Sequence, residues 1–418
     1  MITNFRIIII VLSLLFFAII STVFFFKKEI ISTLGIFKYF KERNSAIELD
    51  EYVVDTTLYD LKLSKISIKK ILKNYNYSKI NSPVGFLESY NNRIFFITNL
   101  GNFFEIENFE NEAIKTINTN FNLIVETENF VKTMGVRGIY FDKLYDKIYV
   151  SYIYNDKINN CTGIALISGN FNNFKNITFK EVFKTKCINY KNLSDFNEMS
   201  SGGKIISLDS ENLLLTIGDF WQKNISQDLS QEYGKILKIN KNNFVSKIYS
   251  FGHRNPQGII KANENIYSTE HGPRGGDEIN HIIENNNYGW PLVSYGPTYK
   301  KDYTKYFLDN HKNYKEPFLA FAPSIGISDI EFYNQNLLQR WKGDLLVASM
   351  KNNTGIINLL NPGLSIYRIK LNQNKNKVIY QEKIYIGDRV RDIEILDNGT
   401  IFFVTEENPA LYKINKDK

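Results

Sequence analysis

The stretch ENLLLTIGDF, residues 211–220, joins a polar turn to a run of β-prone apolar residues, and YGKILKI, residues 233–239, supplies a second such run. Apolar runs bounded by Asn, Asp and Gly are typical of short strands, so each pair predicts two neighbouring strands of a sheet. The same order of turn, strand, break and strand is found five more times, at NNRIFFITNLGNFFEI (91–106), YDKIYVSYIY (145–154), ENIYSTEHG (264–272), KGDLLVASM (342–350) and NGTIFFVTEENPALYKI (398–414).

These copies are spaced by roughly fifty to eighty residues, and no long amphipathic helix interrupts them. A period of this size built from short strands indicates a β-propeller. We therefore expect an all-β fold, a six-bladed β-propeller whose functional loops surround the mouth of a central channel. A pair of β-sandwiches is the alternative that the pattern leaves open.

The N-terminus predicts a membrane anchor. Residues 7–26 form an apolar run of twenty with three polar members, long enough to cross a bilayer core of about 30 Å. No small-residue cleavage site is evident after it, which favours an uncleaved anchor. We predict a transmembrane helix in residues 1–27, a stalk in residues 28–63 and the propeller in residues 64–418.

Charge and cysteine content give weaker indications. The 418 residues carry 51 basic and 44 acidic side chains, with no basic block that would follow a phosphate backbone, so nucleic-acid binding is not expected. More basic residues follow the apolar run than precede it, which favours a cytoplasmic body. Cys161 and Cys187 fit no zinc or redox motif, and either a disulfide or two buried thiols is open.

Three neighbouring motifs combine glycines with charged and aromatic residues: FGHRNPQGI (251–259), EHGPRGGDEIN (270–280) and NYGWPLVSYG (287–296). They resemble the signatures of the glucose/sorbosone dehydrogenase family, whose members are aldose sugar dehydrogenases that depend on pyrroloquinoline quinone (PQQ). The resemblance runs in family order from about residue 64 to the C-terminus. It implies a six-bladed propeller that works outside the cytoplasm, so we expect the body on the extracytoplasmic (periplasmic) face despite the charges beside the anchor.

The resemblance also implies a clamp for the cofactor. PQQ is a flat tricarboxylate, and the forked donors of arginine hold carboxylates well. The residues that match the family's clamp are Arg254, Asn255, Lys351, Arg389 and Arg391. Residues two apart on a strand point to the same face, so Arg389 and Arg391 could grip one ligand together. A solvated strand face is the alternative for this pair.

A calcium site is implied by the glycine-rich motif. Gly272 and Pro273 match the family positions whose backbone carbonyls hold calcium against the cofactor, and glycines let such a loop curl around an ion. Asp277 and Glu278 are candidates for further ligands or for bracing the loop. A glycine-rich blade connection with solvated charges is the alternative.

The motif that holds the proton acceptor in the family differs in this sequence. In the family, an Asp-His or Asn-His pair precedes Gly-Gly-Arg-Leu, and the His takes the proton of the sugar C1 hydroxyl. Here EMSSGGKII (198–206) places Met199 and Ser200 at the pair. A serine cannot replace a histidine base on its own, so Glu198 and Asp195 are the candidate replacement bases.

Upstream, Thr133 replaces the family's Gln or Glu, and Arg137 stands at an apolar position of the family motif. We therefore expect a membrane-anchored, PQQ-dependent oxidoreductase that acts on a sugar or other alcohol with an altered base. The sequence does not identify its electron acceptor. The alternatives are a PQQ- and calcium-binding pseudoenzyme and a propeller that serves only for interaction.

Overall fold

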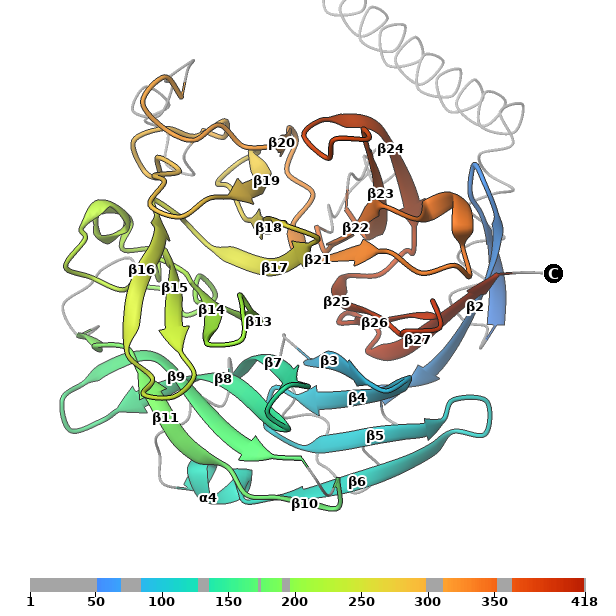
Figure 1. The fold of residues 1–418 in the computed structure, drawn as a ribbon, viewed down its shortest axis with the longest axis horizontal. Helices are drawn as coiled ribbons and strands as arrows, with labels where there is room; N and C mark the ends of the chain where they lie inside the picture. Colours follow the sequence, from blue (N-terminus) through green and yellow to red (C-terminus); the bar gives the residue numbers. More distant parts are fainter. Residues whose placement is uncertain are drawn as a thin grey trace, which may run out of the picture. The chain divides into compact units, whose positions relative to one another are not determined.

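The computed structural model describes residues 51–68, 84–126, 135–171, 174–189, 196–297, 311–351 and 363–416. Figure 1 shows these residues as six β-sheets arranged around a common centre, so the prediction of an all-β, six-bladed propeller is confirmed. Within the described part of the chain, one short helix, α4 (Phe121–Glu126), and two 3-10 turns, at Lys223–Gln227 and Gln339–Trp341, interrupt the strands.

The first three blades follow the order of the chain, except that blade 1 takes one short strand from the segment that forms blade 2. Blade 1 contains β3 (Gly85–Tyr90), β4 (Arg93–Thr98), β5 (Phe103–Asn108), β6 (Ala113–Thr119) and, parallel to β6, β10 (Asn176–Ile177). Blade 2 contains β7 (Val136–Asp142), β8 (Lys147–Asp156), β9 (Cys161–Asn170), β11 (Lys180–Lys184) and β12 (Ile188–Asn189). Blade 3 contains β13 (Gly202–Ser207), β14 (Asn212–Ile217), β15 (Lys235–Asn240) and β16 (Ser246–Phe251).

The next two blades have four antiparallel strands each. Blade 4 contains β17 (Pro256–Ala262), β18 (Asn265–Glu270), β19 (Asp277–Ile282) and β20 (Leu319–Phe321). Blade 5 contains β21 (Ile327–Tyr333), β22 (Asp344–Ser349), β23 (Ser365–Leu371) and β24 (Val378–Tyr385). Blade 6 contains β25 (Val390–Ile395), β26 (Ile401–Thr405), β27 (Ala410–Lys416), β2 (Asp60–Ser67) and β1 (Glu51–Asp55).

Blade 6 closes the ring because it combines both ends of the described chain. Strand β2 pairs antiparallel with β27, from Leu61 opposite Lys416 to Ser67 opposite Ala410. The strands therefore begin at Glu51, before the boundary at residue 64 that the sequence predicted, because a repeat-based reading does not reveal a strand borrowed from the far end of the chain. The predicted anchor at residues 7–26 lies outside the described residues, and the described helices include none that could span a bilayer.

The middle strands of the blades explain why the repeats are nearly continuous apolar runs. Every residue of DLLVAS in β22 is buried, and five of the six in NLLLTI of β14 are buried. Each blade packs against a neighbour on both faces, so these strands have no solvent face that would require alternating polar residues. Phenylalanines fill the space between blades 1 and 2, where the rings of Phe95 and Phe141 lie 4.9 Å apart.

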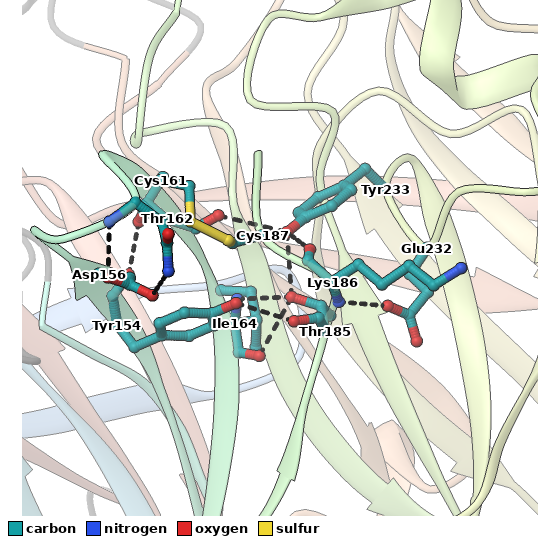
Figure 2. The surroundings of a disulfide bond; sticks show 11 residues. Tyr154, Asp156, Cys161, Thr162, Ile164, Thr185, Lys186, Cys187, Glu232 and Tyr233 are labelled. Carbon is teal, nitrogen blue, oxygen red and sulfur yellow. Dashed lines mark hydrogen bonds between the residues drawn. A yellow bond between two sulfur atoms is a disulfide. The ribbon is translucent and has the colours of Figure 1, made fainter. Parts of the chain in front are cut away.

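A disulfide joins Cys161 on β9 to Cys187, with Cα atoms 5.4 Å apart, which decides the alternative left open by the sequence. Figure 2 shows that hydrogen bonds fix the segment around Cys187 on both sides. Tyr154 of blade 2 donates to the carbonyl of Thr185 at 2.8 Å, and the hydroxyl of Tyr233, just before β15 of blade 3, lies 3.0 Å from the Thr185 hydroxyl. The disulfide therefore secures a segment that links two blades.

Candidate functional site

Six inner strands, one from each blade, surround the centre of the propeller: β3, β7, β13, β17, β21 and β25. All of them except β3 have a shift in pairing register near their first residues. Such bulges re-aim side chains that would otherwise alternate between faces. In β25 the bulge lets the adjacent residues Arg391 and Asp392 both contribute to central clusters.

A cavity of about 770 Å³ lies where the bulged ends of these strands meet. Its lining contains all five residues of the predicted clamp, namely Arg254, Asn255, Lys351, Arg389 and Arg391. They come from blades 4, 5 and 6 or the loops beside their strands, and the outermost two, Arg254 and Arg391, are more than 130 residues apart in the sequence. The fold therefore brings together what the sequence listed as separate motifs.

Arg389 and Arg391 share one carboxylate, Glu406. Nη2 of Arg389 donates to Oε2 of Glu406 at 3.0 Å, and Nε of Arg391 donates to Oε1 at 2.5 Å. Arg389 also donates from Nη1 to the carbonyl of Met350 at 2.9 Å. Two guanidinium groups on one carboxylate are fixed in orientation and leave one positive charge for a ligand.

The FGHRNPQGI motif supplies the other wall. Nη1 of Arg254 donates to the carbonyl of His271 at 3.0 Å, and its guanidinium lies over the ring of Trp290. The side-chain oxygen of Asn255 accepts from the backbone of Gly202 at 3.2 Å and from Nε2 of Gln257 at 2.8 Å. Gln257, which the sequence analysis did not assign to the clamp, connects the two sides of the cavity through Asn255, Arg137 and Arg391.

The glycine-rich loop is held by Asp277. One oxygen of Asp277 accepts from the backbone N–H of Gly272 at 3.0 Å, and the other accepts from those of Gly326 and Ile327 at 2.6 and 3.1 Å. A methyl group on Gly272 would lie 2.1 Å from the carbonyl oxygen of Gly276, so only glycine allows this curl. Asp277 thus braces the loop, which is one of the two roles considered for it.

Glu278, the other candidate ligand, does not line the cavity. It accepts a hydrogen bond from Asn280 at 3.2 Å, and burial and then Glu270 raise its pKa well above the usual range. Among the described residues, no group of three or more His, Cys, Asp or Glu side chains could hold a metal. Backbone carbonyls of Gly272 and Pro273 would not form such a group, so the calcium site stays a prediction.

Comparison with known proteins decides the family. The sequence profile of the glucose/sorbosone dehydrogenases matches residues 85–413. The chain belongs to this family. An aldose sugar dehydrogenase of Escherichia coli is 27% identical over 229 residues, which are 50% of this chain and 57% of the relative. The chain spans about half the length of the curated relatives that it matches.

Solved structures of the glucose/sorbosone dehydrogenase type share the fold. The apo form of a soluble aldose sugar dehydrogenase from Escherichia coli has a TM-score of 0.66 at 20% identity, and the similarity covers 81% of this chain and 97% of that one. The PQQ-bound form of an aldose sugar dehydrogenase from Streptomyces coelicolor has a TM-score of 0.57 at 17% identity and covers 81% and 95%.

Ser200, which we predict to stand at the position of the family's histidine, is buried. Its hydroxyl donates to Oδ1 of Asp219 at 2.7 Å, and Oδ2 of Asp219 accepts from the indole of Trp290 at 2.8 Å. Burial raises the pKa of Asp219. Met199 lines the cavity, whereas Ser200 and Glu198 are absent from its lining.

Glu198 is half-buried, and burial raises its pKa above the usual range. Asp195 and Thr133 lie outside the described residues. The structure therefore brings none of the three candidate catalytic residues, Ser200, Glu198 and Asp195, into the described lining of the cavity. Their catalytic roles stay predictions.

Lys204, which we predict to stand where the family has arginine, lies in a buried cluster of carboxylates beyond the cavity. Its ammonium contacts Asp329 at 3.1 Å and Asp392 at 2.8 Å. Burial opposes its charge, but these carboxylates raise the pKa of Lys204 well above its usual value. The replacement thus keeps a positive charge in the channel and uses it for structure.

Proposed function

We propose that this member of the glucose/sorbosone dehydrogenase family is a PQQ-dependent dehydrogenase of a sugar or other alcohol. The observation that carries the proposal is the convergence of four cationic side chains and one amide on a single cavity. Its volume of about 770 Å³ is in the range of small-molecule sites, roughly 300–1,000 Å³. This donor set fits a flat ligand with several carboxylates.

When bound, PQQ would supply the acceptor for the hydride, with its two electrons, that an alcohol loses on oxidation. The chain's own contribution is to bind and orient it. Arg389 and Arg391, fixed by Glu406, would hold one carboxylate side, and Arg254 would hold the other. The backbone carbonyls of Gly272 and Pro273 would bind a calcium ion. The carboxylate of Asp277 holds their loop by accepting from backbone N–H groups.

The proton of the substrate hydroxyl needs an acceptor that Ser200 does not provide, because its hydroxyl has no suitable pKa and donates to Asp219. This contact favours a second candidate, a protein that binds PQQ and calcium without turning over a sugar. Glu198 stays our candidate base, and burial raises its pKa above the usual range of a carboxyl group, which is the direction that a general base requires.

We further propose that residues 7–26 anchor the chain and hold the propeller on the extracytoplasmic face. The disulfide between Cys161 and Cys187 supports this placement, because disulfides persist in oxidising compartments. Protease added to intact cells should digest the propeller. Protection in intact cells, with digestion only after lysis, would contradict the orientation.

Activity is tested by reconstituting the full chain in detergent with calcium and PQQ and offering aldoses and other alcohols with an artificial electron acceptor. Reduction of the acceptor that requires both PQQ and a substrate supports the dehydrogenase. PQQ binding without turnover of any compound supports the pseudoenzyme. Failure to bind PQQ overturns both.

A further inference from the structure

Arg137 is a buried guanidinium in the cavity that the clamp does not explain. It lies at the bulge of β7, is 3% exposed and lines the cavity. Its Nε donates to the carbonyl of Gly202 at 3.1 Å, and its Nη2 donates to Oε1 of Gln257 at 3.4 Å. These contacts use two of the five N–H groups of a guanidinium. No carboxylate of the described residues forms an ion pair with it.

Arg137 nevertheless stays charged. Burial lowers its pKa to about 9, with a further contribution from Arg391, and this value is still above neutral pH. Gln257 accepts from both guanidinium groups through the same oxygen, at 3.4 Å from Arg137 and 3.2 Å from Arg391. Glu406 is the carboxylate that favours the charge on Arg137, but its two oxygens already accept from Arg389 and Arg391. One carboxylate cannot balance three guanidinium charges, and an uncompensated buried charge is costly, so this corner of the cavity favours an anion.

PQQ alone does not supply that anion. Apart from Arg274, five cationic side chains line the cavity, and Asp219, Asp277 and Glu406 are carboxylates near them. PQQ would bring three negative charges, and the calcium ion expected with it would bring two positive ones. The described site would then keep an excess of about one positive charge, which a second anion could neutralise.

The position of Arg137 indicates which ligand this anion is. Its contact with Gly202 places the guanidinium two residues along the chain from Ser200, where the family has its proton acceptor. The family has an apolar residue at the position of Arg137. Relative to the family's pattern, this end of the cavity therefore lacks a histidine and contains an additional fixed cation. A cation at this position favours a substrate that carries a negative charge.

We propose that the substrate carries its own oxyanion, as a sugar or polyol with a carboxylate or phosphate group, and that Arg137 binds this group. The proposal rests on the proposed function for the identity of the second ligand. The free N–H groups of Arg137 can hold two oxygens of a carboxylate or phosphate side by side.

The test is calorimetric titration of the full chain in detergent, with and without PQQ and calcium. The panel contains D-glucuronate, D-gluconate, D-glucose 6-phosphate and glycerol 3-phosphate, with D-glucose and glycerol as neutral counterparts. Wild type should bind at least one anion more tightly than its neutral counterpart, and the panel separates carboxylates from phosphates. Arg137→Leu should weaken that binding roughly tenfold to a hundredfold, as expected for loss of a charge-assisted contact.

Arg137→Lys should retain part of the affinity, and the exposed Arg340→Leu should bind like wild type. Melting temperatures verify that each variant is folded. Equal binding of neutral and anionic compounds, no binding of any anion, or an Arg137→Leu variant with unchanged affinity overturns the proposal. Weaker PQQ binding with unchanged sugar binding would also overturn it, since Arg137 would then belong to the clamp. Arg137-dependent anion binding without PQQ binding would leave this proposal standing while the dehydrogenase fails.

Discussion

At the scale of single residues, Ser200, which we predict to stand at the position of the family's histidine, has the clearest consequence. The Ser200 hydroxyl lies 2.7 Å from Asp219, so an imidazole at this position would meet a carboxylate that can orient it and stabilise its protonated form. The aspartate that would support a base is therefore present, although the base is not.

We predict that restoring the family pair, with Met199→Asp and Ser200→His, raises turnover of an aldose by about 10²–10⁴-fold, the usual contribution of a general base. The measurement is PQQ-dependent reduction of an artificial acceptor. The exposed Ser210→His serves as the control. No gain in a restored variant that still binds PQQ would mean that Ser200 is not the cause of low activity.

A second residue-scale prediction concerns Glu394, a half-buried carboxylate on the inner strand β25. Burial raises the pKa of Glu394 to about 7. Since the folded state then binds a proton more tightly than the unfolded state, Glu394 costs stability progressively as the pH rises from its unfolded pKa, about 4.3, through 7. Glu394→Gln removes this cost.

The variant should therefore melt at a higher temperature than wild type at pH 8, and the difference should shrink at pH 5. Calorimetric scans over this range measure it, with the exposed Glu264→Gln as the control. A difference between Glu394→Gln and wild type that is the same at every pH would contradict the account of Glu394.

At the scale of elements, the strands were predictable from the sequence but their bulges were not. NLLLTI and DLLVAS are apolar runs between turns, and they form strands β14 and β22. The bulge at Arg137 depends on how β7 pairs with β8, which a single segment does not encode. For this reason Arg137 was recognised as a departure from the family, without a role.

The Cys161–Cys187 disulfide gives the element-scale prediction. It closes a separation of 26 residues, for which the entropy model gives about 3–4 kcal/mol of stabilisation. Replacing both cysteines by serine should lower the free energy of unfolding by that order in chemical denaturation. Ile158→Ser, 91% exposed in the same hairpin, should change it little. An unchanged denaturation midpoint in the double variant would contradict this prediction. It would show that the hydrogen bonds around Thr185 hold the segment without the disulfide.

At the scale of the whole molecule, motif order allowed the propeller and the clamp to be predicted together. Residues 254, 351 and 391 are distant in sequence, and the family resemblance rather than local pattern grouped them before the fold placed them around one cavity. The closing strand β2 was assigned to the stalk in part, since its partner β27 lies at the opposite end of the chain. The carboxylate cluster around Lys204 was missed because its members lie on different blades.

The central claim is that the cavity binds PQQ through Arg389 and Arg391. Equilibrium titration of PQQ into the full chain with calcium tests it most directly, using wild type, Arg389→Ala, Arg391→Ala and the exposed Arg340→Ala as control. Each cavity variant loses a charge-assisted contact worth about 1.5–3 kcal/mol, so its affinity should fall roughly tenfold to a hundredfold while the control binds like wild type. Wild-type affinity in both cavity variants, or no binding by wild type, would contradict the account.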